Sequence, residues 1–259
     1  MAVLLDERRG PVALLRLNRP ESLNALDGEL VAALGAALER ASGDPRVRVI
    51  VLAGEGGAFC SGADLKEALR DLDAGAALGD RLAGFQRNIR LIVEAPQPVI
   101  AAVDGAAVGF GADLALACDL RLLSERGYFE EKFVAIGLMP DGGGTFHLPR
   151  LVGLGRALEL LLLGERIDAQ RAVELGLTSR VLAPKELLDA ALDLAARLAA
   201  APPLALTAIK RATRASVDGT LTDALAREAA GQTALLTSAD LREGVAAFAA
   251  KRKPQFTGK

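Results

Sequence analysis

Two apolar runs, each followed by a glycine-containing turn and a helical pattern, constrain the fold of this chain most strongly. The runs VRVIVLAG (47–54) and QPVIAAVDG (97–105) are rich in β-branched and small apolar residues, as buried strands are. The first leads into GGAFCSGADLKEA (56–68) and the second into DGAAVGFGADLALACD (104–119). Strands that alternate with helices predict an α/β core.

The flanking segments extend this pattern. Residues 3–18 (VLLDERRGPVALLRLN) predict two short strands joined by a charged turn at residues 7–10. Residues 27–44 predict a helix with Asp27 as its N-cap and Gly43 just past its end. The segment YFEEKF (128–133) is expected to be a further strand.

Strand and helix patterns alternate in the first part of the sequence, and only helical patterns follow, so we expect two parts. Residues 1–200 carry the strands and are expected to form the core that binds and transforms a ligand. Residues 201–259 are helical throughout in this interpretation, with Ala-rich apolar faces and no strands. Such helices must pack on something, either on the core of their own chain or on a neighbouring subunit.

Charge and cysteine content exclude several function classes. The formal net charge is −2 and aromatic residues make up 3% of the chain, which disfavours a nucleic-acid partner. The two cysteines, Cys60 and Cys118, lie in apolar runs and are expected to be buried free thiols. The chain has a single histidine, no CxxC spacing and no apolar stretch of the ~18 residues that a membrane span needs. We therefore expect a cytoplasmic protein without a metal site or a membrane contact.

Common catalytic motifs are missing. The chain contains no GxxxxGK[ST], no GxGxxG at the start of a helix, no GxSxG and no HExxH. Phosphate loops, dinucleotide binding, α/β-hydrolase chemistry and zincin chemistry are accordingly disfavoured.

The two glycine-containing turns could instead hold an anion. Glycine allows the backbone to approach a ligand closely and leaves the first N–H groups of the following helix free. Two such N–H groups converging on one oxygen would form an oxyanion hole, which suits the enolate of a thioester. Alternatively, these are ordinary turns, with Asp64 and Asp113 as acids that the helix dipole favours near helix starts.

Six sequence blocks in a fixed order resemble the enoyl-CoA hydratase/isomerase (crotonase) superfamily. They are LNRPESLNAL, IVLAGEGGAFCSGADLKE, PVIAAVDGAAVGFGADLALACDLRL, IGLMPDGGGT, LPRLVG and REGVAAFAAKRKPQF. The resemblance covers nearly the whole chain. It implies a spiral of ββα units around two sheets, a C-terminal helical trimerisation region, a homotrimer or hexamer, and an acyl-CoA substrate with no cofactor beyond the coenzyme A that it carries.

The resemblance also implies roles for particular residues. By position, the oxyanion donors are the backbone N–H groups of Ala63 and Phe110. The positions implied to contact coenzyme A are Ser22, Leu23, Ala25, Ala63, Asp64, Leu65, Phe248 and Lys251. Phe248 could instead be a core residue, and Lys251 a solvated surface charge.

The chain departs from family hydratases at both of their glutamates. Asp113 stands at the first position and Phe133, which would then line the acyl pocket, at the second. Hydration needs one group to activate water and another to protonate carbon, and a phenyl ring can do neither. The neighbouring Glu130 and Glu131 are predicted to be surface acids. Simple hydration is therefore disfavoured, with Asp113 as the acid that would have to carry it.

The remaining acid, Asp141, lies in IGLMPDGGGTFHLPR (136–150). With an acid at position 141, Phe133 and the C-terminal block, the sequence resembles the superfamily isomerases that act on ring-1,2-epoxyphenylacetyl-CoA in phenylacetate breakdown. A carboxylate in an apolar pocket has its pKa raised by desolvation and can move one proton between two carbons. Asp141 could alternatively cap the helix that follows, and His147 is assigned no role.

The sequence thus predicts an acyl-CoA isomerase with Asp141 as its acid–base group. Three alternatives remain open, namely an enoyl-CoA hydratase that uses Asp113, a dienoyl-CoA isomerase, and a non-catalytic member that only binds coenzyme A.

Overall fold

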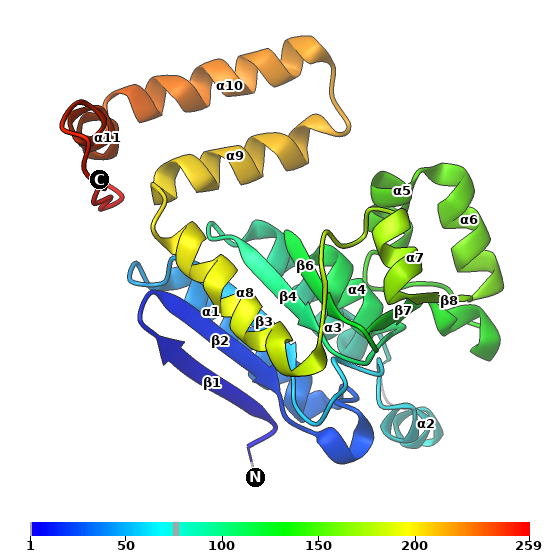
Figure 1. The fold of residues 1–259 in the computed structure, drawn as a ribbon. Coiled ribbons are helices and arrows are strands. Elements are labelled where there is room, and N and C mark those ends of the chain that lie inside the picture. Colours follow the sequence, from blue (N-terminus) through cyan, green and yellow to red (C-terminus); the bar gives the residue numbers. More distant parts are fainter. Residues whose placement is uncertain (1, 75–77) are drawn as a thin grey trace.

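A computed structural model describes residues 2–74 and 78–259, and in this part of the chain two sheets form the core (Figure 1). The larger sheet has six strands in the order β1-β2-β3-β4-β6-β9, with β1 antiparallel to β2 and the other neighbours parallel. Its strands are β1 (Leu4–Arg9), β2 (Val12–Leu17), β3 (Val49–Gly54), β4 (Val99–Val103), β6 (Leu120–Ser124) and β9 (Val181–Leu182). The smaller sheet contains β5 (Ala106–Val108), β7 (Tyr128–Glu130) and β8 (Arg166–Asp168). The predicted α/β core is confirmed.

The first hairpin has a tighter turn than expected. The charged residues Glu7 to Arg9 continue β1, and the chain reverses at Gly10, whose φ is +57°. Because β1 is an edge strand, its charged side chains can face solvent while the strand still pairs with β2. The prediction of a turn at residues 7–10 was therefore too long.

Helices cover both faces of the larger sheet (Figure 1). On one face, α1 (Gly28–Gly43) packs against α3 (Leu78–Glu94). The predicted cap of α1 is confirmed, because the Asp27 side chain accepts a hydrogen bond of 2.8 Å from the Leu30 N–H. On the other face, α8 (Pro184–Ala199) buries Leu187 and Ala191 against strands of the sheet. The remaining elements of the core are η1 (Pro20–Ser22), α2 (Leu65–Asp73), α5 (Gly144–Val152), α6 (Leu154–Leu163) and α7 (Ala169–Glu174).

The helix α4 (Phe110–Ala117) is completely buried, and it follows β5 directly. Its small residues allow this close packing. The segment after it differs from the prediction, since the strand β7 ends at Glu130 and a 3-10 helix, η2 (Lys132–Ile136), follows. The expected strand over 128–133 is therefore wrong in its second half, which changes where Glu131 and Phe133 point.

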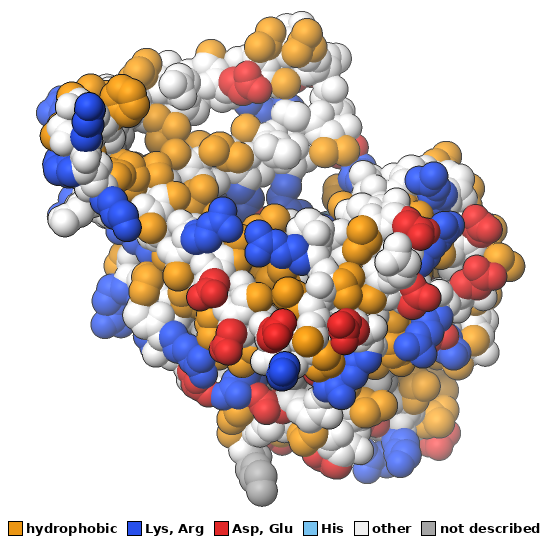
Figure 2. Space-filling view, viewed as in Figure 1, with side chains coloured by type: hydrophobic (Ala, Val, Ile, Leu, Met, Phe, Trp, Pro, Cys, Tyr) orange, Lys and Arg blue, Asp and Glu red, His pale blue; other side chains and the backbone are white. Residues whose placement is uncertain are grey.

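The last three helices form an arm that extends away from the core (Figure 1). They are α9 (Pro203–Ser216), α10 (Leu221–Leu236) and α11 (Ala239–Ala249). The expectation that residues 201–259 are helical throughout is wrong at the C-terminal end, because residues 251–259 contain no helix. Both clusters of buried apolar side chains consist of residues before position 200. Apolar side chains gather along the arm instead (Figure 2). The large exposed ones are Leu204, Ile209, Val217, Leu221, Leu225, Leu236, Leu241, Val245 and Phe248.

Among the described helices, none is by itself long and apolar enough to cross a membrane. The helices α8 and α9 reach that length only together, as a pair bent by 106°.

The arm is tied to the core by a partly buried ionic cluster. The Lys210 ammonium lies 2.8 Å from the Asp119 carboxylate and donates to the carbonyls of Ile92 and Gln97. The Arg214 guanidinium binds the same carboxylate at 2.7 Å. Asp119 follows α4, so this cluster fixes α9 against the end of the helix that carries the candidate site.

Replacing Asp119 by Ala is expected to lower the free energy of unfolding by about 3 kcal/mol, because it leaves two cations without their shared partner in a largely buried place. Urea unfolding measures this change. Asp218→Ala is the matched control, because Asp218 pairs with Arg150 on the surface and an exposed pair contributes less than about 1 kcal/mol. Equal effects of the two substitutions would contradict the assignment.

Candidate active site

The two glycine-containing turns lie side by side. Cys60 and Ala107 form a parallel bridge, and Val108 donates its N–H to the Cys60 carbonyl at 2.9 Å. Gly62 has a φ of +96°, and a Cβ at that position would lie 2.8 Å from the Val108 carbonyl oxygen and 3.5 Å from the Phe110 nitrogen. Only glycine fits such a place, and its use brings the start of α4 against the first turn.

The proposed oxyanion donors meet at this contact. As the first residue of α4, Phe110 has no acceptor for its N–H within the helix. Ala63 is bridged to Leu26, but the two hydrogen bonds of that bridge use the Gly62 carbonyl and the Asp64 N–H. In the described part of the chain, neither the Ala63 N–H nor the Phe110 N–H bonds a protein acceptor. Two free donors from neighbouring turns can therefore receive one ligand oxygen.

A third segment closes over the first turn. Leu23 has a left-handed backbone with a φ of +53°, and its carbonyl accepts the Ser61 N–H at 3.0 Å. The Ser61 hydroxyl donates to the Ser22 carbonyl at 3.1 Å. The segments that the sequence proposed for coenzyme A, residues 22–25 and 63–65, thus lie together, and Leu23 and Leu65 remain half exposed.

Asp64 joins these segments through its side chain. It caps α2 by accepting the N–H groups of Lys66 and Glu67, and it binds the Arg19 guanidinium at 3.2 Å. Partial burial alone would raise the pKa of Asp64, but the Glu67 N–H and the Arg19 cation outweigh it and leave the pKa below its ordinary value. Asp64 is therefore an anchored anion rather than an acid–base group.

Asp113 lies inside α4 and is completely buried. Its Oδ2 accepts a hydrogen bond of 2.9 Å from the Gly142 N–H. A Cβ on Gly142 would stand 2.6 Å from the Phe110 ring and 2.7 Å from the Asp113 Cβ. The glycine run after Asp141 therefore allows the backbone to approach α4. Asp113 is a buried hydrogen-bond acceptor and not merely a solvated acid at a helix start.

Glu131 overturns a prediction, because it is buried and only 2% exposed. The expected surface position assumed a strand that continues past Glu130. Because the chain turns into η2 instead, Glu131 points inward while Glu130 pairs with Lys132 at 2.7 Å. The point where a Cβ on Gly144 would stand lies 2.6 Å from the Asp113 Oδ1 and 3.0 Å from the Glu131 Oε1.

The third carboxyl of the cluster, Asp141, is the only one of the three that is not fully buried. Its carbonyl accepts the Gln86 amide at 3.1 Å, whereas its Oδ1 has no partner among the described residues. Gly143 is the N-cap of α5, and no side chain caps that helix. The alternative prediction that Asp141 is a helix cap is therefore wrong.

All three carboxyls have raised pKa values. Burial raises the pKa of Asp113 to about 7, with a further contribution from the negative charge of Asp141 and an opposing one from the Gly142 N–H. Burial, and then repulsion from Asp113 and Asp141, raises the pKa of Glu131 well above its ordinary value. Burial also raises the pKa of Asp141. Such shifts are typical of groups that exchange protons.

Phe133 stands beside the second turn. It is 8% exposed, and its ring lies 3.7 Å from the point where a Cβ on Gly109 would be. The position that the sequence assigned to the acyl pocket is thus close to Phe110, and the side chain there is apolar. It can shape a pocket but cannot transfer a proton.

His147 does not take part in this cluster. It is buried in α5, and its Cδ2 lies 3.2 Å from the Cβ position of Gly143. Burial, followed by the nearby cations Arg214, Arg121 and Arg150, lowers its pKa to about 4. It is therefore neutral at ordinary pH, and the described residues show no hydrogen bond between His147 and Asp141.

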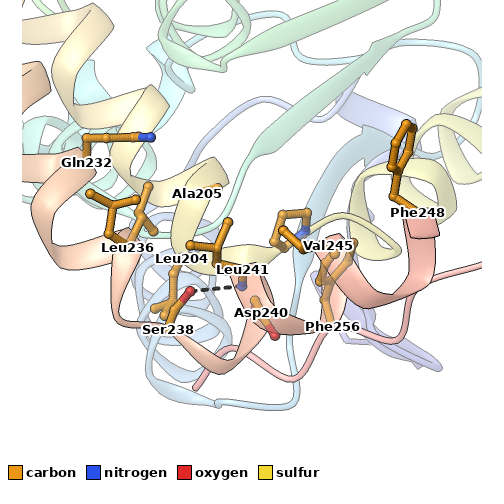
Figure 3. Close-up of a pocket in the computed structure, with 13 residues that line it drawn as sticks. Leu204, Ala205, Gln232, Leu236, Ser238, Asp240, Leu241, Val245, Phe248 and Phe256 are labelled. Atoms are coloured by element: carbon orange, nitrogen blue, oxygen red, sulfur yellow. Dashed lines mark hydrogen bonds between the residues drawn. The ribbon is translucent and has the colours of Figure 1, made fainter. Parts of the chain in front are cut away.

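Two of the predicted coenzyme A contacts lie elsewhere. Phe248, which is 88% exposed, lies near the end of α11 on the arm, and Lys251 follows that helix. The structure does not bring either residue to the turns of the same chain (Figure 1). Phe248 lines an open apolar cavity of about 420 Å³ between α9, α10, α11 and the C-terminal segment (Figure 3). Because that cavity lies away from the three carboxyls, it is not the place where the chemistry occurs.

Comparison with known proteins identifies the family. The family model for enoyl-CoA hydratase/isomerase matches residues 7–259. The chain belongs to the enoyl-CoA hydratase/isomerase family. It is 43% identical to a probable enoyl-CoA hydratase of Rhodobacter capsulatus, over 96% of this chain and 95% of that one. It is also 40% identical to the 1,2-epoxyphenylacetyl-CoA isomerase of Escherichia coli, over 100% of both chains.

Solved structures of the enoyl-CoA hydratase/isomerase family share the fold. The enoyl-CoA hydratase of Bacillus anthracis superimposes with a TM-score of 0.94 at 33% identity, covering 99% of this chain and 100% of that one. The predicted crotonase fold is confirmed. The chain is an enzyme of the crotonase superfamily, and the names of its relatives include both hydratases and an isomerase.

Proposed function

We propose that this family member is an acyl-CoA isomerase in which Asp141 moves the proton. One observation carries the proposal. Of the three clustered carboxyls, Asp113 and Glu131 are sealed from solvent, whereas Asp141 is only half-buried. A substrate carbon can reach only a carboxyl that is open to the site.

The chemistry follows from the arrangement of the donors and the acid. The thioester oxygen would accept the N–H groups of Ala63 and Phe110, which stabilises the negative charge that forms on that oxygen. The Asp141 carboxylate then removes a proton from one carbon and leaves an enolate. The resulting carboxylic acid returns the same proton to a different carbon, so that the double bond moves and Asp141 is regenerated. No cofactor beyond the coenzyme A of the substrate enters this scheme.

For the acyl group, we propose a thioester of the ring-1,2-epoxyphenylacetyl type, in which the same proton transfer by Asp141 would accompany rearrangement of the ring epoxide. Support comes from the Phe133 ring beside the second turn and from the full-length similarity to the 1,2-epoxyphenylacetyl-CoA isomerase. A large apolar side chain in this place favours a substrate with an apolar ring over one that needs a water molecule there.

Hydration is the second candidate, and the two buried carboxyls of Asp113 and Glu131 favour it. Asp113 and Glu131 together supply two carboxyls whose pKa values are raised, which is the number that hydration requires. In this alternative the substrate would have to open the site enough to expose Asp113 to water.

A panel of thioesters separates the two candidates. Wild type, Asp141→Asn and Asp113→Asn are assayed side by side with 3-enoyl-, 2-enoyl- and ring-epoxidised arylacetyl-CoA. The isomerase proposal expects double-bond migration that Asp141→Asn abolishes and Asp113→Asn largely retains. Hydration of 2-enoyl-CoA that survives in Asp141→Asn and disappears in Asp113→Asn would establish the second candidate instead.

We also propose that the enzyme is a cytoplasmic homotrimer or hexamer. The exposed apolar side chains of the arm support this assembly. Phe248 and Lys251 would then contact coenzyme A bound to a neighbouring subunit, since both belong to the arm and not to the turns of their own chain.

A further inference from the structure

Glu131 and Asp113 face each other across Gly144. Oxygens of both carboxyls lie within 3.0 Å of the point that a Cβ on Gly144 would occupy. Both side chains are almost completely buried, at 2% and 0% exposure. Two ionised carboxylates at such a distance in a dry place would repel each other strongly, so the pair holds at least one proton at neutral pH.

The hydrogen-bond partners indicate which carboxyl carries that proton. Asp113 Oδ2 accepts the Gly142 N–H at 2.9 Å, which favours the charged form of Asp113. By contrast, Glu131 Oε1, Glu131 Oε2 and Asp113 Oδ1 have no partner among the described residues. A proton on Glu131 directed at Asp113 Oδ1 satisfies two of these three oxygens with one short O–H···O bond.

We propose that Glu131 is a positioning residue, which shares one proton with Asp113 and thereby fixes the Gly142–Gly144 turn that carries Asp141. The connection is short. Asp113 accepts the N–H of Gly142, which is bonded covalently to Asp141, and the shared proton would hold the free oxygen of Asp113 against Glu131. Without Glu131, Asp113 can rotate away from the turn, Gly142 loses its fixed place beside Phe110, and Asp141 moves with it.

The groups around the pair leave it with a single negative charge. Asp113 on α4 and Asp141 on the turn before α5 are the ionisable groups that bear on Glu131. Lys132, although adjacent, pairs with Glu130 and is more than half exposed. His147 on α5 is neutral, since burial lowers its pKa to about 4. No cation among them offsets a second negative charge, so the shared proton is retained.

Two substitutions at one position test the positioning role. Glu131→Gln keeps a donor that can bond Asp113, and it is expected to retain turnover within about threefold of wild type. Glu131→Leu fills the space without a donor and is expected to lower kcat by roughly 10²-fold while KM changes little, because the acid is misplaced rather than the coenzyme A site. Glu130→Gln, one residue away and paired with Lys132 instead of facing Asp113, is the matched control and should leave both constants unchanged.

Infrared spectroscopy tests the shared proton without reference to turnover. At neutral pH, the wild-type protein should show a carbonyl band of a buried protonated carboxyl, and Glu131→Gln should lack it while Glu130→Gln retains it. A merely structural role for Glu131 would not produce this band. If Glu131→Leu does not fold, the infrared comparison of wild type with Glu131→Gln still shows whether Glu131 carries the shared proton.

Because the pair acts through Asp141, the inference rests on the function proposed above, yet the two fail differently. Turnover that persists in Asp141→Asn sinks the proposed function and leaves the infrared band in place. A missing band, a band that survives in Glu131→Gln, or a folded Glu131→Leu with wild-type kcat overturns the role of Glu131 while Asp141 can still be essential.

Discussion

Replacing Asp141 by Asn is expected to lower kcat/KM for double-bond migration by about 10²–10⁴-fold, the usual contribution of a positioned acid–base group. Asn has the size of Asp and can keep the Gln86 contact, which uses the backbone carbonyl of residue 141. The substitution therefore removes proton transfer without removing a structural bond. Steady-state assays with a 3-enoyl-CoA measure the loss, and thermal unfolding checks that the fold persists.

The pH profile of the wild-type enzyme gives the same group a second signature. Burial raises the pKa of Asp141, so the carboxylate needed to remove a proton is lost at a higher pH than for an exposed Asp. We expect kcat/KM to fall as the pH falls through that raised pKa. Asp218→Asn, a change to an exposed acid, is the control and should leave the profile unchanged. Asp141→Asn activity within tenfold of wild type would contradict the assignment.

Replacing Ala63 by Pro is expected to lower kcat/KM by about 10²–10³-fold, as the loss of one oxyanion donor does in other enzymes. Proline lacks the N–H that is proposed to hold the thioester oxygen. The bridge to Leu26 uses the Gly62 carbonyl and the Asp64 N–H, so no existing hydrogen bond at position 63 is lost. Kinetics and urea unfolding together separate the catalytic effect from a loss of stability.

The control for this prediction is Ala63→Ser, which keeps the backbone donor in a side chain of similar size. It should retain turnover within a few-fold of wild type. A folded Ala63→Pro enzyme with nearly wild-type turnover would show that the Ala63 N–H does not hold the reacting oxygen.

Much of the fold could be predicted because the signals are local. The β-branched runs before Gly54 and Gly105 are buried strands, and Asp27 caps the helix that follows it. The arm was expected to need a partner surface because its apolar faces had no strands beside them. Its anchoring by Asp119 was not predicted, since Asp119 and Lys210 are far apart in the sequence.

The sequence predicted the two turns of the site, but it did not predict that three carboxyls cluster there. Sequence position placed Ala63 and Phe110 on two similar turns, and glycine explains why those turns can touch. Glu131 was missed because an alternating strand was assumed to run through Phe133, whereas the strand ends at Glu130. The structure shows that Glu130, and not Glu131, pairs with Lys132.

The most direct test of proton movement by a single acid is product analysis of one incubation. Wild-type enzyme and a 3-enoyl-CoA are followed by mass spectrometry, which separates an isomer of unchanged mass from a product that has gained water. We predict that the 2-enoyl-CoA isomer accumulates without a water adduct and that Asp141→Asn forms neither. A water adduct as the main product, formed equally by Asp141→Asn, would contradict the assignment of this enzyme as an isomerase.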